Sequence, residues 1–459
     1  MYQIDFKKPV RVHFIGIGGI SMSGLAEILM NEGFSVSGSD MKSSALTEGL
    51  ASKGARIDIG QRAENIRDPE LVVYTAAIHP DNPEYAEAVR RGIPMLSRAQ
   101  LLGEIMSNYK EAINIAGTHG KTTTTSMLSE ILIDAEKDPT VSVGGLLDAI
   151  GGNLRNGGKD FFVAEACEYT NSFLSFNPTV AVILNVEADH LDFFKDIDDI
   201  RHSFREFART LPQDERGFLI INGDIRDLEY FTGGLGCGYV TFGIGEENDY
   251  SASNISFDDL ARPSFDIIRR GERMGHVELK VHGGHNITDA LAAAAAADRV
   301  GVSFDIICGA LSSYEGVKRR FEHKGRVNGC DIVDDYAHHP QEIEATLKAA
   351  AGCRHRHLYV VFQPHTYTRT KALINEFAAA LSKADTVILA DIYAAREVNT
   401  LGISSEQLAS LVNKEGGNAV YIPDFEKIKK YILETVGEGD LLITMGAGNV
   451  VDIANQLTE

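Results

Sequence analysis

Short apolar runs alternate with helical patterns along most of this sequence, and this alternation constrains the fold more than any other feature. In the first hundred residues, we expect strands at Val10 to Ile15, Phe34 to Gly38 and Leu71 to Thr75, and a helix at Ser21 to Asn31. Strands that alternate with helices form parallel βαβ units. The sequence therefore predicts an α/β protein.

The length of the chain predicts three domains in series. At 459 residues it exceeds one ordinary core, because a domain averages about 150 residues. We expect a Rossmann-like domain at 1–107, a central P-loop-type ATPase domain at 108–321, and a second Rossmann-like domain at 322–459. From Tyr239 to His282 the pattern changes to short strands separated by Gly, Asn and Pro, which predicts a small antiparallel patch in the central domain.

Composition narrows the classes of function. The chain has 44 Lys and Arg against 65 Asp and Glu, a net charge of −21, which argues against general nucleic-acid binding. No apolar run approaches the roughly 18 residues of a membrane span, and the first residues lack the apolar stretch of a signal peptide. The five cysteines are scattered and form no CxxC pair, so reduced thiols are expected. These features predict a cytoplasmic protein without membrane insertion.

A glycine-rich turn, GIGGIS at residues 16–21, follows the first expected strand and precedes a helix. At such a position, backbone N–H groups and the helix dipole favour a diphosphate. Asp40 ends the second strand, where a carboxylate can hold a ribose hydroxyl. Ser21 stands where the third glycine of the NAD fingerprint belongs. The motif predicts a nucleotide diphosphate and leaves its identity open; a tight turn without a ligand is the alternative.

The strongest local signal is GTHGKTT at residues 117–123, between an expected strand at Ala112 to Ala116 and an expected helix at Thr122 to Asp134. It is a shortened relative of the Walker A loop. Its backbone amides can cradle triphosphate oxygens, Lys121 can reach the outer phosphates, and the Thr122 hydroxyl can bind Mg²⁺. The loop predicts ATP as a ligand.

Two downstream residues are expected to complete a metal site. Glu165 follows the strand Phe161 to Ala164, and His190 follows the strand Val180 to Asn185. In a parallel sheet, both strand ends face the edge that carries the phosphate loop. A carboxylate suits Mg²⁺, whereas His190 is equally well interpreted as a hydrogen-bonded structural histidine. Glu168 is interpreted as a loop carboxylate.

Polar clusters follow two strands expected in the last third of the chain. DDYAHHP at residues 334–340 follows one strand, and QPHTYTR at residues 363–369 follows the next. The neighbouring strand ends are expected to bring His338, His365 and Arg369 to one cleft. That cleft suits an anionic substrate or a transferring phosphoryl group.

Two further features carry open alternatives. Asn286 opens an alanine-rich helix and is interpreted as a cap, with an adenine contact as the alternative. The run Lys318-Arg319-Arg320 is either a solvated charge run or a triphosphate clamp at a domain junction.

The motifs of this sequence, taken in their order along the chain, resemble those of the Mur ligase family. The resemblance runs almost from one end of the chain to the other. The resemblance rests on FIGIGGISMSGLAEIL, GTHGKTTTT, VAEACEY, NVEADHLDFF, GGHNITDALAA, YEGVKRRFE, DDYAHHP and FQPHTYTRT. It implies an N-terminal domain for a UDP-sugar, a central ATPase, and a C-terminal domain that contacts ATP and an amino acid. It also implies that the first glycine turn holds UDP rather than NAD.

The resemblance implies ATP-driven amide formation, an early cytoplasmic step of peptidoglycan synthesis, by a monomer or homodimer. The lactyl carboxylate of UDP-N-acetylmuramate would attack the γ-phosphate of ATP, giving an acyl phosphate and ADP. The amine of L-alanine would then attack the activated carbonyl, and phosphate would leave. Catalysis of this kind consists mostly of positioning and charge neutralisation.

The matching motifs also imply a role for each site residue. Lys121 would stabilise the transferring phosphoryl group, with His338 near the γ-phosphate and Arg369 facing the substrate. Thr122 and Glu165 would hold one Mg²⁺, and His190 would hold a second, directly or through water. The implied ATP contacts are Gly117, Thr118, His119, Gly120, Lys121, Thr122, Thr123, Asn286, Arg320 and Asp335, and the implied UDP-sugar contacts are Gly16, Gly18, Gly19, Asp40 and His365.

Three positions depart from the family pattern. Thr366 stands where many members have an arginine, and Asp289 replaces the asparagine usual after HNxx. The segment at residues 168–171 differs from the commoner ESDA version. These departures bear on one anionic contact, on a second adenine contact, and on the roles of residues 168–171, respectively.

Several alternatives stand beside this interpretation. Within the family, the nearest is a ligase that attaches a recycled tripeptide to the same nucleotide sugar, although its first turn usually departs from GIGGxxMSG. Folylpolyglutamate synthetase shares the phosphate loop but lacks the UDP-binding domain. An NAD-dependent oxidoreductase would leave GTHGKTT unexplained, and a non-catalytic nucleotide-binding scaffold would leave the polar strand ends without a role.

Overall fold

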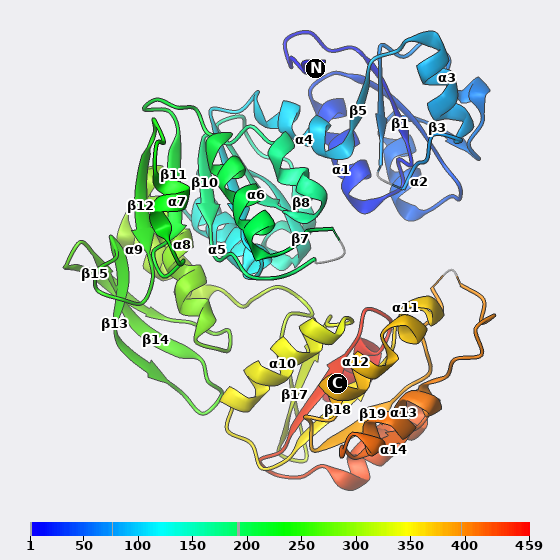
Figure 1. Ribbon diagram of the computed structural model, residues 1–459, viewed down its shortest axis with the longest axis vertical. Helices are drawn as coiled ribbons and strands as arrows, with labels where there is room; N and C mark the ends of the chain where they lie inside the picture. The colour runs from blue at the N-terminus through cyan, green and yellow to red at the C-terminus, as the bar shows by residue number, and fades with distance from the viewer. Residues whose placement is uncertain (1, 76, 191–192, 396) are drawn as a thin grey trace. The chain divides into compact units, whose positions relative to one another are not determined.

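The computed structural model describes residues 2–75, 77–190, 193–395 and 397–459 (Figure 1). It contains three sheets, which confirms the predicted α/β architecture of three domains. By contact density the chain forms two compact units. The first comprises residues 1–252, 267–274 and 288–310, and the second comprises residues 253–266, 275–287 and 311–459.

The N-terminal sheet has the strand order β3-β2-β1-β4-β5, and every pairing is parallel. The order reverses between β1 and β4, and ligands of open α/β sheets bind outside the strand ends at such a switch point. The elements are β1 (Arg11–Ile15), α1 (Ile20–Asn31), β2 (Ser35–Asp40), α2 (Ala45–Ser52), β3 (Arg56–Ile59), η1 (Ala63–Asn65), β4 (Leu71–Tyr74), α3 (Pro83–Arg91), β5 (Met95–Ser97) and α4 (Arg98–Met106).

The central sheet has ten strands in the order β15-β14-β13-β12-β11-β10-β6-β9-β7-β8. Strands β10 and β9 flank β6 in parallel, which brings the ends of all three to one edge. The elements are β6 (Glu111–Ala116), α5 (Lys121–Asp134), β7 (Thr140–Leu147), η2 (Asp148–Ile150), β8 (Gly152–Arg155), β9 (Phe161–Ala166), η3 (Tyr169–Ser175), β10 (Val180–Ile183), α6 (Ile197–Arg209), β11 (Phe218–Asn222), α7 (Leu228–Thr232), β12 (Gly238–Phe242), β13 (Tyr250–Phe257), β14 (Pro263–Arg269), β15 (Glu272–Glu278), α8 (His285–Arg299) and α9 (Phe304–Ser313).

The predicted short strands after Tyr239 are β12 to β15, but β12 pairs in parallel with β11 and β13, so the predicted antiparallel arrangement does not include β12. Turns of a few residues join β13 to β14 and β14 to β15, and connections this short make antiparallel hairpins because a parallel pair needs a long crossover. The alanine run of α8, residues 292–297, is completely buried. Strands β7 and β8, which pair antiparallel, are not among the predicted elements.

The C-terminal sheet has the order β16-β17-β21-β18-β19-β20, in which only the β16–β17 pairing is antiparallel. Apolar clusters cover both of its faces. The elements are β16 (Glu322–Val327), β17 (Cys330–Asp335), α10 (Pro340–Gly352), β18 (Leu358–Phe362), α11 (Tyr367–Ala372), α12 (Ile374–Leu381), β19 (Thr386–Leu389), α13 (Ser405–Lys414), β20 (Ala419–Tyr421), α14 (Phe425–Thr435), β21 (Leu441–Met445) and α15 (Val451–Thr458). None of the helices in the described ranges has the length and apolar character to cross a membrane.

Candidate active site

The first glycine turn uses most of its own N–H groups inside the protein. The N–H groups of Gly16 and Ile17 donate to the Ser39 carbonyl at 2.9 and 3.0 Å, and the N–H of Gly19 donates to the Gly16 carbonyl at 3.3 Å. The N–H groups left for an anion are those of the first turn of α1, at residues 20–22, which have no acceptor within the helix. The donors that this turn offers to an anionic ligand are therefore the N–H groups at the start of α1, and not those of its own glycines.

Asp40 lies at the end of β2, as predicted, and its carboxylate binds the backbone of the same turn. Its Oδ2 accepts from the Gly18 N–H at 2.9 Å, and its Oδ1 accepts from the Met41 N–H at 2.8 Å. A Cβ at residue 18 would lie 2.8 Å from Asp40 Oδ2, so this approach requires glycine. A carboxylate accepts about four hydrogen bonds, and both oxygens retain capacity for the predicted ribose contact.

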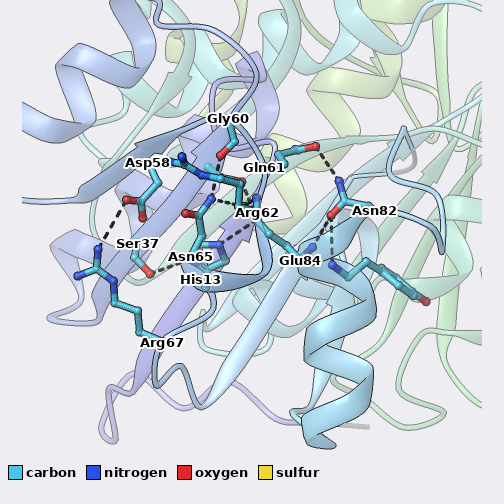
Figure 2. A network of polar contacts seen from close by, with 12 residues as sticks. His13, Ser37, Asp58, Gly60, Gln61, Arg62, Asn65, Arg67, Asn82 and Glu84 are labelled. Atoms are coloured by element: carbon cyan, nitrogen blue, oxygen red, sulfur yellow. Dashed lines mark hydrogen bonds and ion pairs between the residues drawn. The ribbon is translucent and has the colours of Figure 1, made fainter.

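A buried polar network supports the strand ends behind this turn (Figure 2). Glu84 Oε2 accepts from His13 Nε2 at 3.2 Å and Ser39 Oγ at 2.6 Å, while Oε1 accepts from Asn65 Nδ2 at 2.5 Å and the Arg62 N–H at 3.2 Å. Both Glu84 and His13 are 0% exposed. Burial alone would raise the pKa of Glu84, but these hydrogen bonds hold its pKa below the ordinary value. The network fixes Ser39, whose carbonyl anchors the turn.

The phosphate loop lies between β6 and α5, as predicted. Gly120 has φ 85°, a left-handed conformation that favours glycine. Asn185, at the end of the neighbouring strand, brackets the loop: its Oδ1 accepts from the His119 N–H at 2.8 Å, and its Nδ2 donates to the His119 carbonyl at 3.1 Å. The Glu187 N–H donates to Thr118 Oγ1 at 3.0 Å. These bonds hold the loop while the first-turn N–H groups of α5 stay available to an anion.

Lys121 lies folded over this loop. Its Nζ donates to the carbonyls of Gly117 at 2.5 Å and Thr118 at 3.2 Å, and forms an ion pair with Glu168 Oε2 at 2.9 Å. The Glu168 side chain is only 2% exposed. The sequence interpretation of Glu168 as a loop carboxylate missed this pairing. A triphosphate that binds here competes with Glu168 for the ammonium group.

The predicted metal ligands lie at the same sheet edge. Glu165 is opposite Ile115 in the β6–β9 register, and its Oε1 accepts from the Gly144 N–H at 2.5 Å. His190 Nε2 lies 3.9 Å from Glu168 Oε1, and its ring stacks obliquely on Tyr169. Leu191 and Asp192, which continue the NVEADHLDFF motif, lie outside the described residues.

These side chains fit a hard cation by their chemistry. A hydroxyl at Thr122 and carboxylates at Glu165 and Glu168 are oxygen donors of the kind that Mg²⁺ binds together with water. In the part of the chain that the structure describes, no group of three or more His, Cys, Asp or Glu side chains is placed to hold a metal ion. The arrangement therefore suits an ion that takes part of its coordination from phosphate oxygens and water.

Asp289 lies directly beneath the phosphate loop, on α8. A Cβ at Gly120 would collide with Asp289 Oδ1, so the helix and the loop pack in van der Waals contact at this point. The side chain is buried, and its Oδ2 has no hydrogen-bond partner among the described residues. Burial raises the pKa of Asp289 to about 8. The position that departs from the family pattern thus supports the loop from below.

In the second unit, two adjacent aspartates at the end of β17 organise the basic run. Asp335 accepts from the N–H groups of Phe321 and Ala337, each at 2.8 Å, and burial raises its pKa to about 6. Asp334, fully buried, forms an ion pair with Arg319 Nε at 2.9 Å. The predicted clamp residue Arg320 therefore sits between two anchored neighbours, and Arg319 serves the fold.

The two polar strand ends of the C-terminal domain converge as predicted. The rings of His338 and His365 lie 6.0 Å apart, and Tyr393 stacks on His365 at 5.6 Å. Burial lowers the pKa of both histidines, and the nearby Arg369 lowers them further. His365 Nδ1 and Arg369 Nη1 are buried and have no hydrogen-bond partner in the described ranges. Unsatisfied buried donors of this kind suit an anionic or carboxylate-bearing ligand.

Asn286 begins α8 and belongs to the same unit. Its Nδ2 donates to the His282 carbonyl at 2.6 Å, and the side chain is buried. This bond is local to the helix start, but the amide nitrogen donates it, so it is not the predicted cap bond, in which a side-chain oxygen accepts from a backbone N–H. Its amide oxygen remains available for the predicted nucleotide contact.

Family models match the chain in three successive segments. Residues 11–110 match the Mur ligase family catalytic domain, residues 115–297 match the Mur ligase middle domain, and residues 319–448 match the Mur ligase glutamate ligase domain. Together these segments cover most of the sequence.

Similar full-length proteins carry one name. The chain is 58% identical to the UDP-N-acetylmuramate--L-alanine ligase of Lachnospira eligens, over 100% of both chains, and 57% identical to that of Agathobacter rectalis, over 100% of this chain and 99% of the relative. Among solved structures, the UDP-N-acetylmuramate-alanine ligase of Thermotoga maritima matches with a TM-score of 0.76 at 29% identity, over 98% of both chains. A murein peptide ligase of Psychrobacter arcticus matches with a TM-score of 0.67 at 26% identity, over 98% of both chains.

Proposed function

The chain belongs to the Mur ligase family, and from that premise we propose that it joins L-alanine to the lactyl carboxylate of UDP-N-acetylmuramate, with ATP converted to ADP and phosphate. Relatives named for this activity share 57 and 58% of their residues with it over essentially their full length. Amide formation of this kind belongs to peptidoglycan synthesis, and we propose that the protein acts in the cytoplasm, as a monomer or homodimer.

The reaction proceeds in two balanced steps. A carboxylate oxygen of the lactyl group attacks the γ-phosphorus, the bond to the β–γ bridging oxygen breaks, and ADP leaves. The amine of L-alanine then attacks the acyl carbon, loses a proton, and expels inorganic phosphate. A free carboxylate is a poor acylating agent, so the first step supplies the driving force for the second.

The phosphate loop carries the first step. First-turn N–H groups of α5 receive the triphosphate oxygens, and Lys121 neutralises the charge that develops on the transferring group. Glu168 holds the Lys121 ammonium in place at 2.9 Å before the nucleotide arrives. The observation that carries this proposal is the position of Lys121, clamped over a glycine loop at the edge shared by β6, β9 and β10.

Thr122, Glu165 and His190 are the residues proposed to hold Mg²⁺, with Glu168 as a further oxygen donor beside them. When bound, the cation supplies charge neutralisation for the phosphate oxygens. Glu165 is held by the Gly144 N–H, which keeps one of its oxygens in a fixed direction. His190 is the softer donor and suits a water-mediated contact.

The second unit supplies the remaining contacts in this proposal. Arg320, Asn286 and Asp335 bind the nucleotide, and His338 lies near the γ-phosphate. Arg369 Nη1 and His365 Nδ1, both buried without a partner among the described residues, receive the substrate carboxylate. Thr366 supplies no cation at the position where many family members have arginine, so Arg369 carries this charge.

Phosphate release tests the proposal directly. The full-length protein is assayed with ATP, Mg²⁺ and UDP-N-acetylmuramate, and with L-alanine, L-serine, glycine or a recycled-type tripeptide in turn. We expect the highest kcat/KM with L-alanine. Turnover with the tripeptide alone would assign the chain to the murein peptide ligases, and phosphate release independent of the nucleotide sugar would overturn the ligase assignment.

A further inference from the structure

Arg98 is a cation at the first glycine turn with no carboxylate to neutralise it. It is the first residue of α4, directly after β5, and its Nη1 donates to Ser21 Oγ at 3.1 Å. No ion pair to Asp or Glu is formed by Arg98 within the residues that the structure describes. Five other arginines of this domain, Arg11, Arg56, Arg67, Arg90 and Arg91, pair with carboxylates.

The position of Arg98 is fixed by the cap of α4 and by the strand order of the sheet. Ser97 caps α4 through a reciprocal pair of bonds with Gln100, which fixes where the helix starts. Strand β5 neighbours β4, and β4 neighbours β1, so the starts of α1 and α4 lie at the same edge of the sheet. Ser21, in the first turn of α1, then receives the guanidinium.

The backbone of the turn offers few free N–H donors to a diphosphate. The N–H groups of residues 16–19 are all engaged by protein acceptors, and Asp40 adds a negative charge beside Gly18. A diphosphate that binds here has only the first-turn N–H groups of α1 and must face that carboxylate. The chain has a net charge of −21, and a nearby cation offsets the repulsion between this carboxylate and a diphosphate.

We propose that Arg98, oriented by Ser21, binds the diphosphate of the nucleotide-sugar substrate at the first glycine turn. The inference rests on the proposed function and names a contact that none of the glycine or aspartate residues supplies. It also explains why serine occupies the third-glycine position of the dinucleotide fingerprint: its hydroxyl holds the arginine over the start of α1. A guanidinium binds two phosphate oxygens at once, which a single backbone N–H does not.

The electrostatics of Arg98 agree with this role. Burial lowers the pKa of Arg98, which means that its surroundings disfavour the charge as the protein stands. An anion bound against the guanidinium removes that penalty. A surface arginine that only solubilises the protein has no such deficit.

Binding of UDP, UMP and uridine to the full-length protein tests the inference. Isothermal titration is carried out on the wild type, on Arg98→Ala and Arg98→Lys, and on Arg62→Ala as a matched control. Arg62 is also an arginine of this domain at the same sheet edge, exposed and without a carboxylate partner in the described ranges. We expect Arg98→Ala to weaken UDP about 10- to 100-fold, the range of a charge-assisted hydrogen bond, and to leave uridine within about twofold.

Arg98→Lys and one further variant, Ser21→Ala, keep the test decisive. Arg98→Lys retains charge but not the fork, and is expected to recover only part of the affinity; Ser21→Ala is expected to lose about threefold by releasing the guanidinium. Equal losses for UDP and uridine would show that Arg98 serves the fold and would overturn the inference, as would UDP binding that is unchanged in Arg98→Ala.

The ligase assay separates this inference from the proposed function. If the wild type releases phosphate with UDP-N-acetylmuramate and L-alanine but Arg98→Ala keeps the wild-type KM for the nucleotide sugar, only the role of Arg98 is wrong. If the wild type shows no such turnover, the proposed function is wrong, whatever UDP binding shows. The KM for ATP is expected to change less than twofold in Arg98→Ala.

Discussion

The two glycine-rich turns of this protein have the same place in their sheets but are supported in opposite ways. The first turn engages the N–H groups of residues 16–19 internally and rests on Glu84, whose carboxylate accepts hydrogen bonds from four donors. The phosphate loop, which likewise leaves the start of its helix open, rests on Asp289, which has an oxygen without a partner among the described residues.

This difference separates two ways of binding phosphate. At the first turn, we propose that Arg98 supplies the cation. At the phosphate loop, we propose that the first-turn N–H groups of α5 act together with Lys121, which forms an ion pair with Glu168 before a triphosphate binds. The first arrangement suits a substrate that is held through the reaction, and the second suits a group that changes its charge and leaves.

The largest effect is expected from removing the cation of the phosphate loop. Lys121→Ala should reduce single-turnover ADP formation by about 10³-fold, because the charge of the transferring group then lacks its main side-chain neutraliser. The Kd of UDP-N-acetylmuramate should stay within about twofold, since the first turn does not use this residue. Lys137→Ala, in the same domain, is the control. Activity within tenfold of the wild type would refute the loop assignment.

A smaller effect is expected from replacing Glu165 or His190, the proposed metal ligands, and the two replacements should affect different steps. Glu165→Ala should weaken the use of MgATP by about 10²-fold, because a hard oxygen ligand is lost. His190→Ala should mainly slow acyl-phosphate formation once the carboxylate substrate is bound, and Mn²⁺ should enlarge this effect because it accepts imidazole more readily. Single-turnover ADP formation in each metal, with nucleotide affinity measured separately, distinguishes them. Equal loss of nucleotide affinity in both variants would contradict the division of roles.

Many of the strands and helices were predictable from the local sequence. The strand predicted at Ala112 to Ala116 and the helix predicted at Thr122 to Asp134 each differ from the observed elements, β6 and α5, by one residue. Apolar runs between turn residues determine such elements with little help from distant parts of the chain. Strand β7 escaped prediction because two glycines interrupt it, so its pairing with β9 depends on tertiary contacts.

The supporting contacts of the site were not predictable for a physical reason. Glu168 and Lys121 are 47 residues apart, and Gly120 meets Asp289 across a still longer separation. A motif identifies the residues that touch a ligand, but the partner that balances a buried charge depends on how strands and helices pack. The internal use of the first turn's N–H groups is likewise invisible in GIGGIS, since Ser39 and Asp40 lie on another strand.

Breaking the network behind the first turn should affect sugar binding and stability together. In Glu84→Gln, an amide NH₂ replaces one acceptor among four donors, so the free energy of unfolding should fall by about 2 to 4 kcal/mol. The KM for UDP-N-acetylmuramate should rise severalfold because Ser39 no longer anchors the turn, while the KM for ATP should not change. Urea unfolding and steady-state kinetics measure both. Glu87→Gln, which removes a carboxylate that pairs with Arg90 and Arg91 on the same helix and lies outside the network, is the control; a parallel rise in both KM values would mean a general loss of structure.

The mildest change is expected from Asp289→Asn, and its sign depends on pH. Because the pKa of Asp289 is raised to about 8 in the folded protein and is about 4 when unfolded, the folded state keeps a proton that the unfolded state loses between these values. The stability contributed by Asp289 is therefore fully present below about pH 4, falls as the pH rises, and is lost above about pH 8. Asparagine does not titrate, so Tm of the variant minus Tm of the wild type should increase from pH 5 to pH 8 and then level off.

Thermal unfolding at one-unit steps from pH 5 to pH 9 measures this difference, with Asp305→Asn, an exposed carboxylate of α9, as the control. The control should show a difference that does not vary with pH in this range. At neutral pH the ligase activity of Asp289→Asn should stay within about threefold, because a neutral acid and an amide have nearly the same shape beneath Gly120. A Tm difference independent of pH would mean that Asp289 is ionised beneath the loop, and the contrast between a satisfied and an unsatisfied support for the two turns would then be wrong.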